Sequence, residues 1–114
     1  MKIIGHRGAR GLAPENTVAA ILKGMEHKVD LVEFDLRVTK DGIVVLDHDG
    51  RITDPNGERH TISQTNYKIL KAHKPDLSTF QEVLDATKGR VKLYVEVKKG
   101  EPIKPIVAII NSAL

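Results

Sequence analysis

The sequence predicts an α/β fold in which parallel strands alternate with helices on one side of the sheet. Apolar residues occupy every second position along 31–38 and 91–97, the pattern of strands buried on one face. Residues 18–29, 80–88 and 105–110 carry apolar residues at helical spacing instead. Both strands place charged residues on their second face, although an open parallel sheet is apolar on both faces. This favours a barrel, whose interior can carry polar groups at the C-terminal strand ends.

The first half of the chain is expected to contain three strands and a helix. Residues 2–6 are predicted as a short buried strand, and Pro14 and Asn16 mark the start of the first helix. Asp41-Gly42 predicts a hairpin that joins the strand 31–38 to a return run at 43–46. A two-residue turn would place Asp35 opposite His48, and a longer turn would shift this pairing by a residue or two.

The second half is expected to begin with an irregular insertion, residues 50–77, that contains a helical turn around Tyr67–Leu70. Ser78 or Thr79 caps the helix that follows, and Gly89 ends it. Pro105 opens the last helix after the strand 91–99. We treat residues 1–114 as a single domain, because the length of 114 residues is typical of one.

Composition excludes several classes of function. The net charge is only +3, no basic block occurs and aromatic residues make up 4%, so nucleic-acid binding is not favoured. The chain contains no cysteine, which excludes disulfides and thiolate metal sites. No signal peptide or membrane span is apparent in the sequence, and we expect a soluble cytoplasmic protein.

Three carboxylates, Glu33, Asp35 and Glu96, lie on the polar faces of the two strands. Clustered carboxylates repel one another and lose hydration, and a divalent cation with oxygen ligands resolves both problems. We therefore expect a Mg²⁺ or Ca²⁺ site. The alternative is that these residues form solvated ion pairs with Lys98 and Arg37 at the strand ends.

His6 and His48 lie at strand ends and are candidates for acid–base catalysis on a phosphodiester. The guanidinium of Arg7 suits phosphate oxygens, and Lys98 adds a second positive charge. Each histidine alone could be a surface or capping residue, the interpretation that we give to three others in the chain, His27, His60 and His73.

Two further features of the N-terminal turn have structural interpretations. Residues 14–17, Pro-Glu-Asn-Thr, form a loop that ends in a helix cap, and Glu15 could hold Arg7 in place. Glycines at positions 5, 8 and 11 would let the backbone approach a ligand closely.

The stretches "HRGARGLAPENT", "VEFDLRVTKDGIVVLDHD", "STFQEVLDA" and "VEVK" occur in the order and approximate spacing of the glycerophosphodiester phosphodiesterase family. Each stretch alone is weak, but the ordered set resembles that family from position 4 to position 98. Family members often carry a larger insertion than "GRITDPNGERHTISQTNYKILKAHKPDLS", which suggests a small, simple substrate cap here.

The resemblance implies a TIM-type barrel with a divalent metal on Glu33, Asp35 and Glu96. It implies His6 and His48 as the acid–base pair, Arg7 and Lys98 as phosphate contacts, and hydrolysis of a glycerophosphodiester to sn-glycerol 3-phosphate and an alcohol. One route within the family is attack by the neighbouring glycerol hydroxyl, giving a cyclic phosphate that water opens.

The length of the chain leaves alternatives open. A TIM barrel needs about 250 residues, and this chain supplies three barrel strands and a hairpin. We expect either a fragment of a longer protein or an assembly of copies that covers the open sheet edges. A fragment that binds metal and phosphate without turnover, or only self-associates, is one alternative function. A phospholipase D-like enzyme acting on choline phospholipids is another.

Overall fold

The computed structural model describes residues 3–8 and 14–113. Its main sheet consists of β1 (Ile4–His6), β2 (Leu31–Val38), β3 (Val44–Leu46) and β6 (Lys92–Val97). The helices are α1 (Val18–Glu26), α2 (Tyr67–His73), α3 (Phe80–Thr87) and α4 (Ile103–Ala113), and η1 (Ile62–Gln64) is a short 3₁₀ turn. A second, two-stranded sheet pairs β4 (Arg51–Thr53) with β5 (Arg59–Thr61).

Strand β2 is the centre of the main sheet. It pairs in parallel with β6 along residues 31–36 and in parallel with β1 at residues 31–33. Because Leu31 has partners in both β1 and β6, those two strands lie on opposite edges of β2. Leu36 likewise has partners in β6 and in the antiparallel strand β3. Both β1 and β3 therefore lie on the edge of β2 that faces away from β6, at different positions along the strand. The order β1, α1, β2, α3, β6 gives the parallel β/α arrangement that the sequence predicts.

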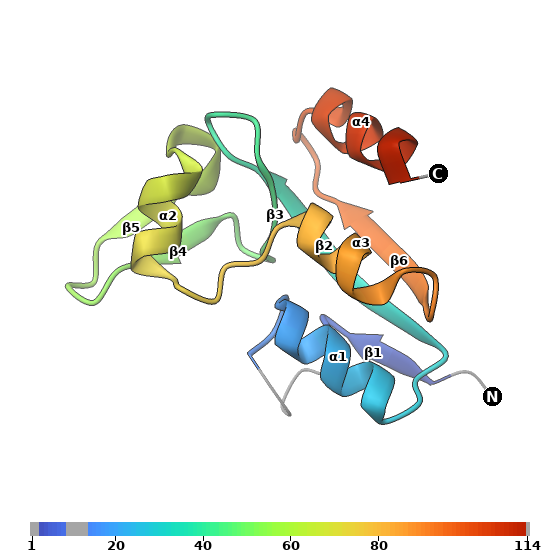
Figure 1. Ribbon diagram of the computed structural model, residues 1–114. Coiled ribbons are helices and arrows are strands. Elements are labelled where there is room, and N and C mark those ends of the chain that lie inside the picture. The colour runs from blue at the N-terminus through green and yellow to red at the C-terminus, as the bar shows by residue number, and fades with distance from the viewer. Residues whose placement is uncertain (1–2, 9–13, 114) are drawn as a thin grey trace.

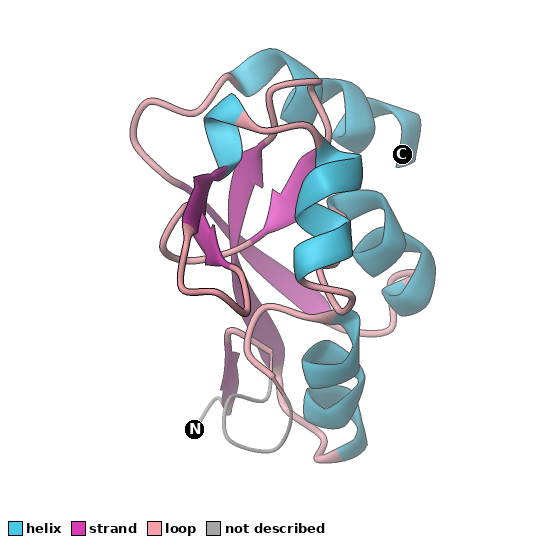
Figure 2. Cartoon of the chain, turned by 90° about the vertical axis from the view of Figure 1, so that its left-hand side faces the viewer, coloured by secondary structure: helices cyan, strands magenta, loops and turns pink. Residues whose placement is uncertain are grey.

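One face of the main sheet forms the core. Figures 1 and 2 show α1, α3 and α4 on the same side of it. The alternating residues Val32, Phe34, Leu36 and Val38 of β2 are all buried beneath these helices, as predicted. Helix α3 begins at a capping box in which the Thr79 and Glu82 side chains bond each other's backbone N–H groups. The opposite face of β2 is left for the polar side chains that form the site.

The segment 50–77 is more regular than predicted. It folds into the β4–β5 hairpin, η1 and α2. The sequence predicts the turn at residues 55–57 and the helical turn around Tyr67–Leu70, but not the two strands of the hairpin. These elements enclose a second small core made of Val45, Ile52, Ile62, Leu70 and Leu77. The missed hairpin turns at Pro55-Asn56-Gly57 and has strands of only three residues, too short for an alternating pattern to stand out.

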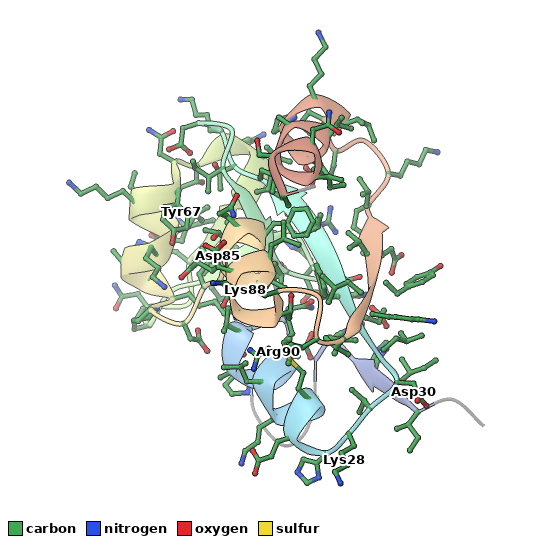
Figure 3. The ribbon with its side chains drawn as sticks, turned by 45° about the vertical axis from the view of Figure 1, so that its right-hand side comes forward. Lys28, Asp30, Tyr67, Asp85, Lys88 and Arg90 are labelled. Carbon is green, nitrogen blue, oxygen red and sulfur yellow. The ribbon has the colours of Figure 1, made fainter. Side chains whose placement is uncertain are left out.

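Strand β1 is not the buried strand that the sequence predicts. Ile3 and Ile4 are more than half exposed, because β1 pairs only with β2 among the described residues. The segment is anchored by Asp30, which lies just before β2 (Figure 3). The Ile3 N–H donates to Asp30 Oδ2 at 2.5 Å, and the Asp30 N–H donates to the Ile3 carbonyl. No described helix is long and apolar enough to cross a membrane.

The hairpin between β2 and β3 differs by one residue from the two-residue turn considered above. Leu36 pairs with Leu46 and Val38 with Val44, so Asp35 comes opposite Asp47 and not His48. The cause is Thr39, whose hydroxyl accepts the Ile43 N–H at 3.0 Å while its N–H donates to the Ile43 carbonyl. Three residues therefore make the turn.

Gly5 and Gly8 are required for packing, and Gly11 lies outside the described residues. Gly8 has a φ of +85°, and a Cβ there would lie 2.6 Å from the Ala20 Cβ and 2.9 Å from the Ile21 backbone nitrogen. A Cβ on Gly5 would lie 2.6 Å from the Gly8 carbonyl oxygen. The first turn is thus pressed against α1.

Replacing Gly8 with alanine is expected to destabilise the chain by about 3 kcal/mol, the sum of left-handed strain and overpacking. Gly42→Ala is the matched control, because Gly42 has a φ of +82° but no atom within 4 Å of its Cβ position. Strain alone should cost about 1 kcal/mol there. Urea unfolding curves measure both, and equal losses would show that packing against α1 contributes nothing.

Candidate active site

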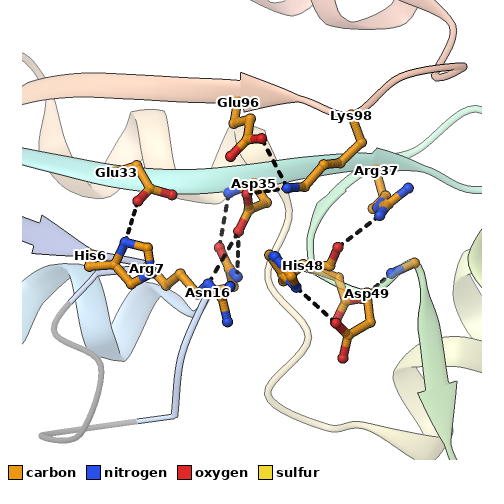
Figure 4. A network of polar contacts seen from close by, with 12 residues as sticks. His6, Arg7, Asn16, Glu33, Asp35, Arg37, His48, Asp49, Glu96 and Lys98 are labelled. Carbon is orange, nitrogen blue, oxygen red and sulfur yellow. Dashed lines mark hydrogen bonds and ion pairs between the residues drawn. The ribbon is translucent and has the colours of Figure 1, made fainter.

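Three carboxylates meet on the polar face of the main sheet. Strand pairing places Asp35 of β2 directly beside Glu96 of β6, and Glu33 lies two residues before Asp35 on the same face. One oxygen from each of the three side chains lies within 4.8 Å of the other two (Figure 4). The sequence therefore predicted correctly that these three groups gather in one place.

Asp35 is the buried centre of this cluster, with 1% of its side chain exposed. Asn16 donates from Nδ2 to Asp35 Oδ2 at 3.1 Å, and the Asp35 N–H donates back to Asn16 Oδ1 at 3.0 Å. Burial opposes ionisation of Asp35, but the hydrogen bond from Asn16 and the nearby Lys98 outweigh it and hold its pKa below the ordinary value. Asp35 is thus a preformed buried anion.

Asn16 is a functional candidate that sequence reasoning missed. It is 1% exposed and adopts a left-handed backbone with a φ of +55°, which asparagine tolerates better than most residues. Its N–H donates to the Arg7 carbonyl at 2.8 Å, so it joins the first turn to β2. The structure confirms Thr17 as the helix cap. The sequence signal that could have pointed to Asn16 is that it precedes the capping residue Thr17 and takes no part in the cap itself.

His6 and His48 each place Nδ1 on a carboxylate. His6 Nδ1 lies 2.5 Å from Glu33 Oε2, and the pairing of β1 with β2 sets these two residues side by side. His48 Nδ1 lies 2.8 Å from Asp49 Oδ1. In the view of Figure 4, Asp35 and Asn16 lie between the two histidines. Because an ionised carboxylate only accepts hydrogen bonds, Nδ1 donates and Nε2 remains for a second partner.

Arg37 positions the segment that carries His48, a role that the sequence did not reveal. Its Nη2 donates to the His48 carbonyl at 2.7 Å, and its Nη1 lies 3.4 Å from Glu101 Oε1. Glu101 also accepts the Val38 N–H at 3.0 Å. The sequence considered Arg37 only as a partner for the strand carboxylates. The structure uses it instead to hold the loop that carries His48 against the end of β2.

Two cations border the carboxylates. Arg7 Nη1 lies 2.8 Å from Glu15 Oε2, as the sequence suggested, and Arg7 Nε lies 3.7 Å from Asp35 Oδ2. Lys98 Nζ lies 3.0 Å from Glu96 Oε1 and 3.3 Å from Asp35 Oδ1. The hydrogen bond to Glu96 and the charge of Asp35 raise the pKa of Lys98. All seven residues predicted for the site therefore lie along this face or at the loop bordering it.

The neighbouring carboxyl of Asp47 responds differently to its surroundings. Burial raises its pKa above the ordinary value of 3.8, although the Gly50 N–H donates to Oδ2 at 2.7 Å. A folded-state pKa above the unfolded one means that the folded chain holds the proton more tightly. Its contribution to stability is therefore full below the unfolded pKa and is lost as pH rises through the folded pKa.

Asp47→Asn should remove this loss, because an amide oxygen can still accept the Gly50 N–H. Relative to the wild type, the free energy of unfolding of the variant should increase between pH 4 and pH 7, which means that the variant becomes relatively more stable. Asp85→Asn, which removes an exposed carboxylate on α3, is the control for charge removal. Denaturant unfolding at the two pH values measures the effect, and a relative change of opposite sign would contradict the burial argument.

Comparison with known proteins identifies the family. The sequence model of the Glycerophosphoryl diester phosphodiesterase family matches residues 6–108. The chain belongs to this family. It is 48% identical to the Bacillus subtilis protein YhdW over an alignment that covers 90% of the chain. It is 35% identical to a lysophospholipase D of Homo sapiens over an alignment that covers 92% of the present chain.

A solved structure of an Oleispira antarctica phosphodiesterase, in complex with the product sn-glycerol-3-phosphate, superposes on 99% of the chain with a TM-score of 0.84 and 26% identity. The fold is therefore part of the β/α barrel of the family. The chain spans 53% of that structure, 46% of YhdW and 34% of the human enzyme. It thus covers about half or less of the length of the proteins that it resembles.

Proposed function

We propose that this chain carries the catalytic face of an enzyme that hydrolyses glycerophosphodiesters to sn-glycerol 3-phosphate and an alcohol. The observation that carries the proposal is the arrangement of two histidines, His6 and His48, each held through Nδ1 by a carboxylate, around a cluster of three carboxylates. Family membership supports the same class of reaction.

The carboxylate cluster fits a divalent cation. All of its donors are oxygens, which Mg²⁺ and Ca²⁺ prefer. Asp35 Oδ1 is buried and lies 3.3 Å from Lys98 Nζ, but it accepts no aligned hydrogen bond from the described residues, so a lone pair remains for a ligand. We propose Glu33, Asp35 and Glu96 as the residues that would hold the ion. Such an ion supplies a Lewis acid that polarises a phosphoryl oxygen.

The two histidines would move the protons of the reaction. With Nδ1 donating to a carboxylate, a neutral imidazole presents a basic Nε2, and the protonated ring presents an acidic N–H there. One histidine takes the proton of the attacking hydroxyl, whether water or the neighbouring glycerol hydroxyl. The other donates a proton to the oxygen of the leaving alcohol. Glu33 and Asp49 fix the rings and stabilise their charged forms.

Arg7 and Lys98 would bind the phosphate. Both flank Asp35, with less than a fifth of each side chain exposed. Negative charge builds up on the phosphoryl oxygens in the transition state, and cations held in a partly buried site stabilise it more than they would in water. The ion pairs with Glu15 and Glu96 keep the two side chains in position before substrate binds.

Lysophospholipid hydrolysis is a second candidate function. A cavity of about 400 Å³ lies beside His6 and Glu33 and is walled by Ile4, Leu31 and Tyr94, which suits an acyl chain. The human relative is named as a lysophospholipase D. The two substrates share the glycerophosphodiester and differ only in that chain.

The test is the release of products from glycerophosphocholine and from lysophosphatidylcholine in the presence of Mg²⁺ or Ca²⁺. It should be run on the 114-residue chain and on any longer polypeptide of the same reading frame. Release of choline and glycerol 3-phosphate together from glycerophosphocholine supports the main proposal. Faster hydrolysis of lysophosphatidylcholine supports the second. Release by the longer polypeptide alone would make this chain a non-catalytic part. Release by neither would contradict both.

Glu33→Gln tests the proposed metal group in the same preparation. The substitution removes one anionic ligand while keeping the size of the side chain, so the affinity for Mg²⁺ or Ca²⁺ should fall at least about tenfold. Glu26→Gln on the exposed side of α1 is the matched control. Isothermal titration measures both, and an unchanged affinity in the Glu33 variant would remove Glu33 from the ligand set.

A further inference from the structure

The insertion between β3 and α3 contains a second cluster of metal-binding side chains. Asp54 at the end of β4, His60 on β5 and His73 at the end of α2 each place one ligand atom within 4.8 Å of the other two. The sequence alone suggests a surface or capping role for both histidines. The β4–β5 pairing and the packing of α2 over the hairpin bring them together, although 13 residues separate them along the chain.

The carboxylate of this cluster is already oriented. Asp54 Oδ1 accepts the N–H groups of Asn56 and Glu58 at 2.9 and 3.0 Å, which directs Oδ2 to His60 Nε2 at 2.9 Å. Only 7% of the Asp54 side chain is exposed. A ligating carboxylate whose other oxygen is held by backbone amides is typical of built metal sites.

The two imidazole rings are stacked, with centroids 4.4 Å apart and planes 15° from parallel. Two imidazolium ions in this arrangement would repel each other, whereas neutral rings can stack and present lone pairs. Two imidazoles and one carboxylate form a donor set that suits Zn²⁺. Tetrahedral ligands around Zn²⁺ lie roughly 3.3 Å apart, and the lone pair of an imidazole nitrogen lies in the plane of its ring. Binding one ion would therefore rotate one of the two imidazoles out of the stack.

We propose that Asp54, His60 and His73 form a Zn²⁺ site that joins the β4–β5 hairpin to the end of α2. The site is independent of the proposed active site, because it uses none of the same residues and has nitrogen donors where the other has only oxygens. Its consequence is structural: the metal would fix the insertion that packs against Val45 of β3.

The experiment is titration of the full chain with Zn²⁺ and, separately, with Co²⁺ as a spectroscopic probe. The background is Glu33→Gln/Glu96→Gln, which disables the carboxylate cluster. We expect one equivalent of Zn²⁺ to bind, a Co²⁺ visible spectrum typical of imidazole ligation, and a rise in Tm with Zn²⁺. His73→Gln should weaken Zn²⁺ binding by at least about tenfold and abolish the rise.

His27→Gln is the matched control, since His27 is exposed at the end of α1. His73 closes a helix and is half-buried, so its replacement should leave the fold intact, which circular dichroism verifies. Equal Zn²⁺ affinity in the His73 and His27 variants would overturn the proposal, as would the absence of Zn²⁺ binding in the background chain. Failure here would leave the assignment of His6 and His48 untouched.

Discussion

Replacing His6 with alanine is expected to lower the rate of glycerophosphodiester hydrolysis by about 10² to 10⁴-fold, the usual contribution of a positioned acid or base. The imidazole is held by Glu33 at 2.5 Å and belongs to the last residue of β1, so its removal takes away a proton carrier and little packing. More than half of the His6 side chain is exposed, and stability should change little.

The control for His6→Ala is His27→Ala, which removes an exposed imidazole just beyond the C-terminal end of α1. His48→Ala should reproduce the loss of rate, because both protons must move for the bond to break. Initial rates and Mg²⁺ or Ca²⁺ affinity should be measured together, since the affinity is expected to persist in both variants. A His6 variant with near-normal rates would mean that the acid–base assignment is wrong.

Asn16→Asp is expected to lower the free energy of unfolding by about 3 kcal/mol, as much as Gly8→Ala. The change removes the Nδ2 donor to Asp35 and places a second carboxylate against a buried one, while keeping the side-chain shape. Aspartate also tolerates the left-handed backbone at this position, so the effect comes from the lost hydrogen bond and the added charge and not from backbone strain. Metal binding and turnover should fall as well, because Asp35 loses the group that keeps it oriented.

Asn111→Asp, an exposed position on α4, is the matched control and should change stability by less than about 0.5 kcal/mol. Urea unfolding gives the free energies for both variants. A loss equal to that of the control would mean that the Asn16–Asp35 bonds do not stabilise the fold. A large loss of stability with an unchanged metal affinity would restrict Asn16 to a structural role.

Much of the fold could be predicted, because alternation in β2 and β6 separates their faces without knowledge of tertiary contacts. The apolar face of β2 became the core, and the opposite face gathered Glu33, Asp35 and Glu96 as expected. The hairpin register could not be predicted, since it depends on one hydroxyl: Thr39 adds a residue to the turn and moves Asp35 away from His48.

The parts of the site that escaped prediction are long-range. Asn16 contacts Asp35 across 19 residues and Glu101 contacts Arg37 across 64, and neither pair shows a local pattern. The histidines of the insertion escaped for the same reason, because only folding of β4–β5 against α2 stacks His60 on His73. Local periodicity predicts faces of elements, whereas hydrogen bonds between loops and strands depend on tertiary structure.

The most direct test of the proposed activity is the release of glycerol 3-phosphate from glycerophosphocholine, followed with a chelator and then with excess Mg²⁺ or Ca²⁺. We predict that the chelator abolishes release, that the metal restores it, and that restoration fails in His6→Ala. Release that continues in the chelator, or that is restored equally in the His6 variant, would contradict a single site built from these histidines and carboxylates.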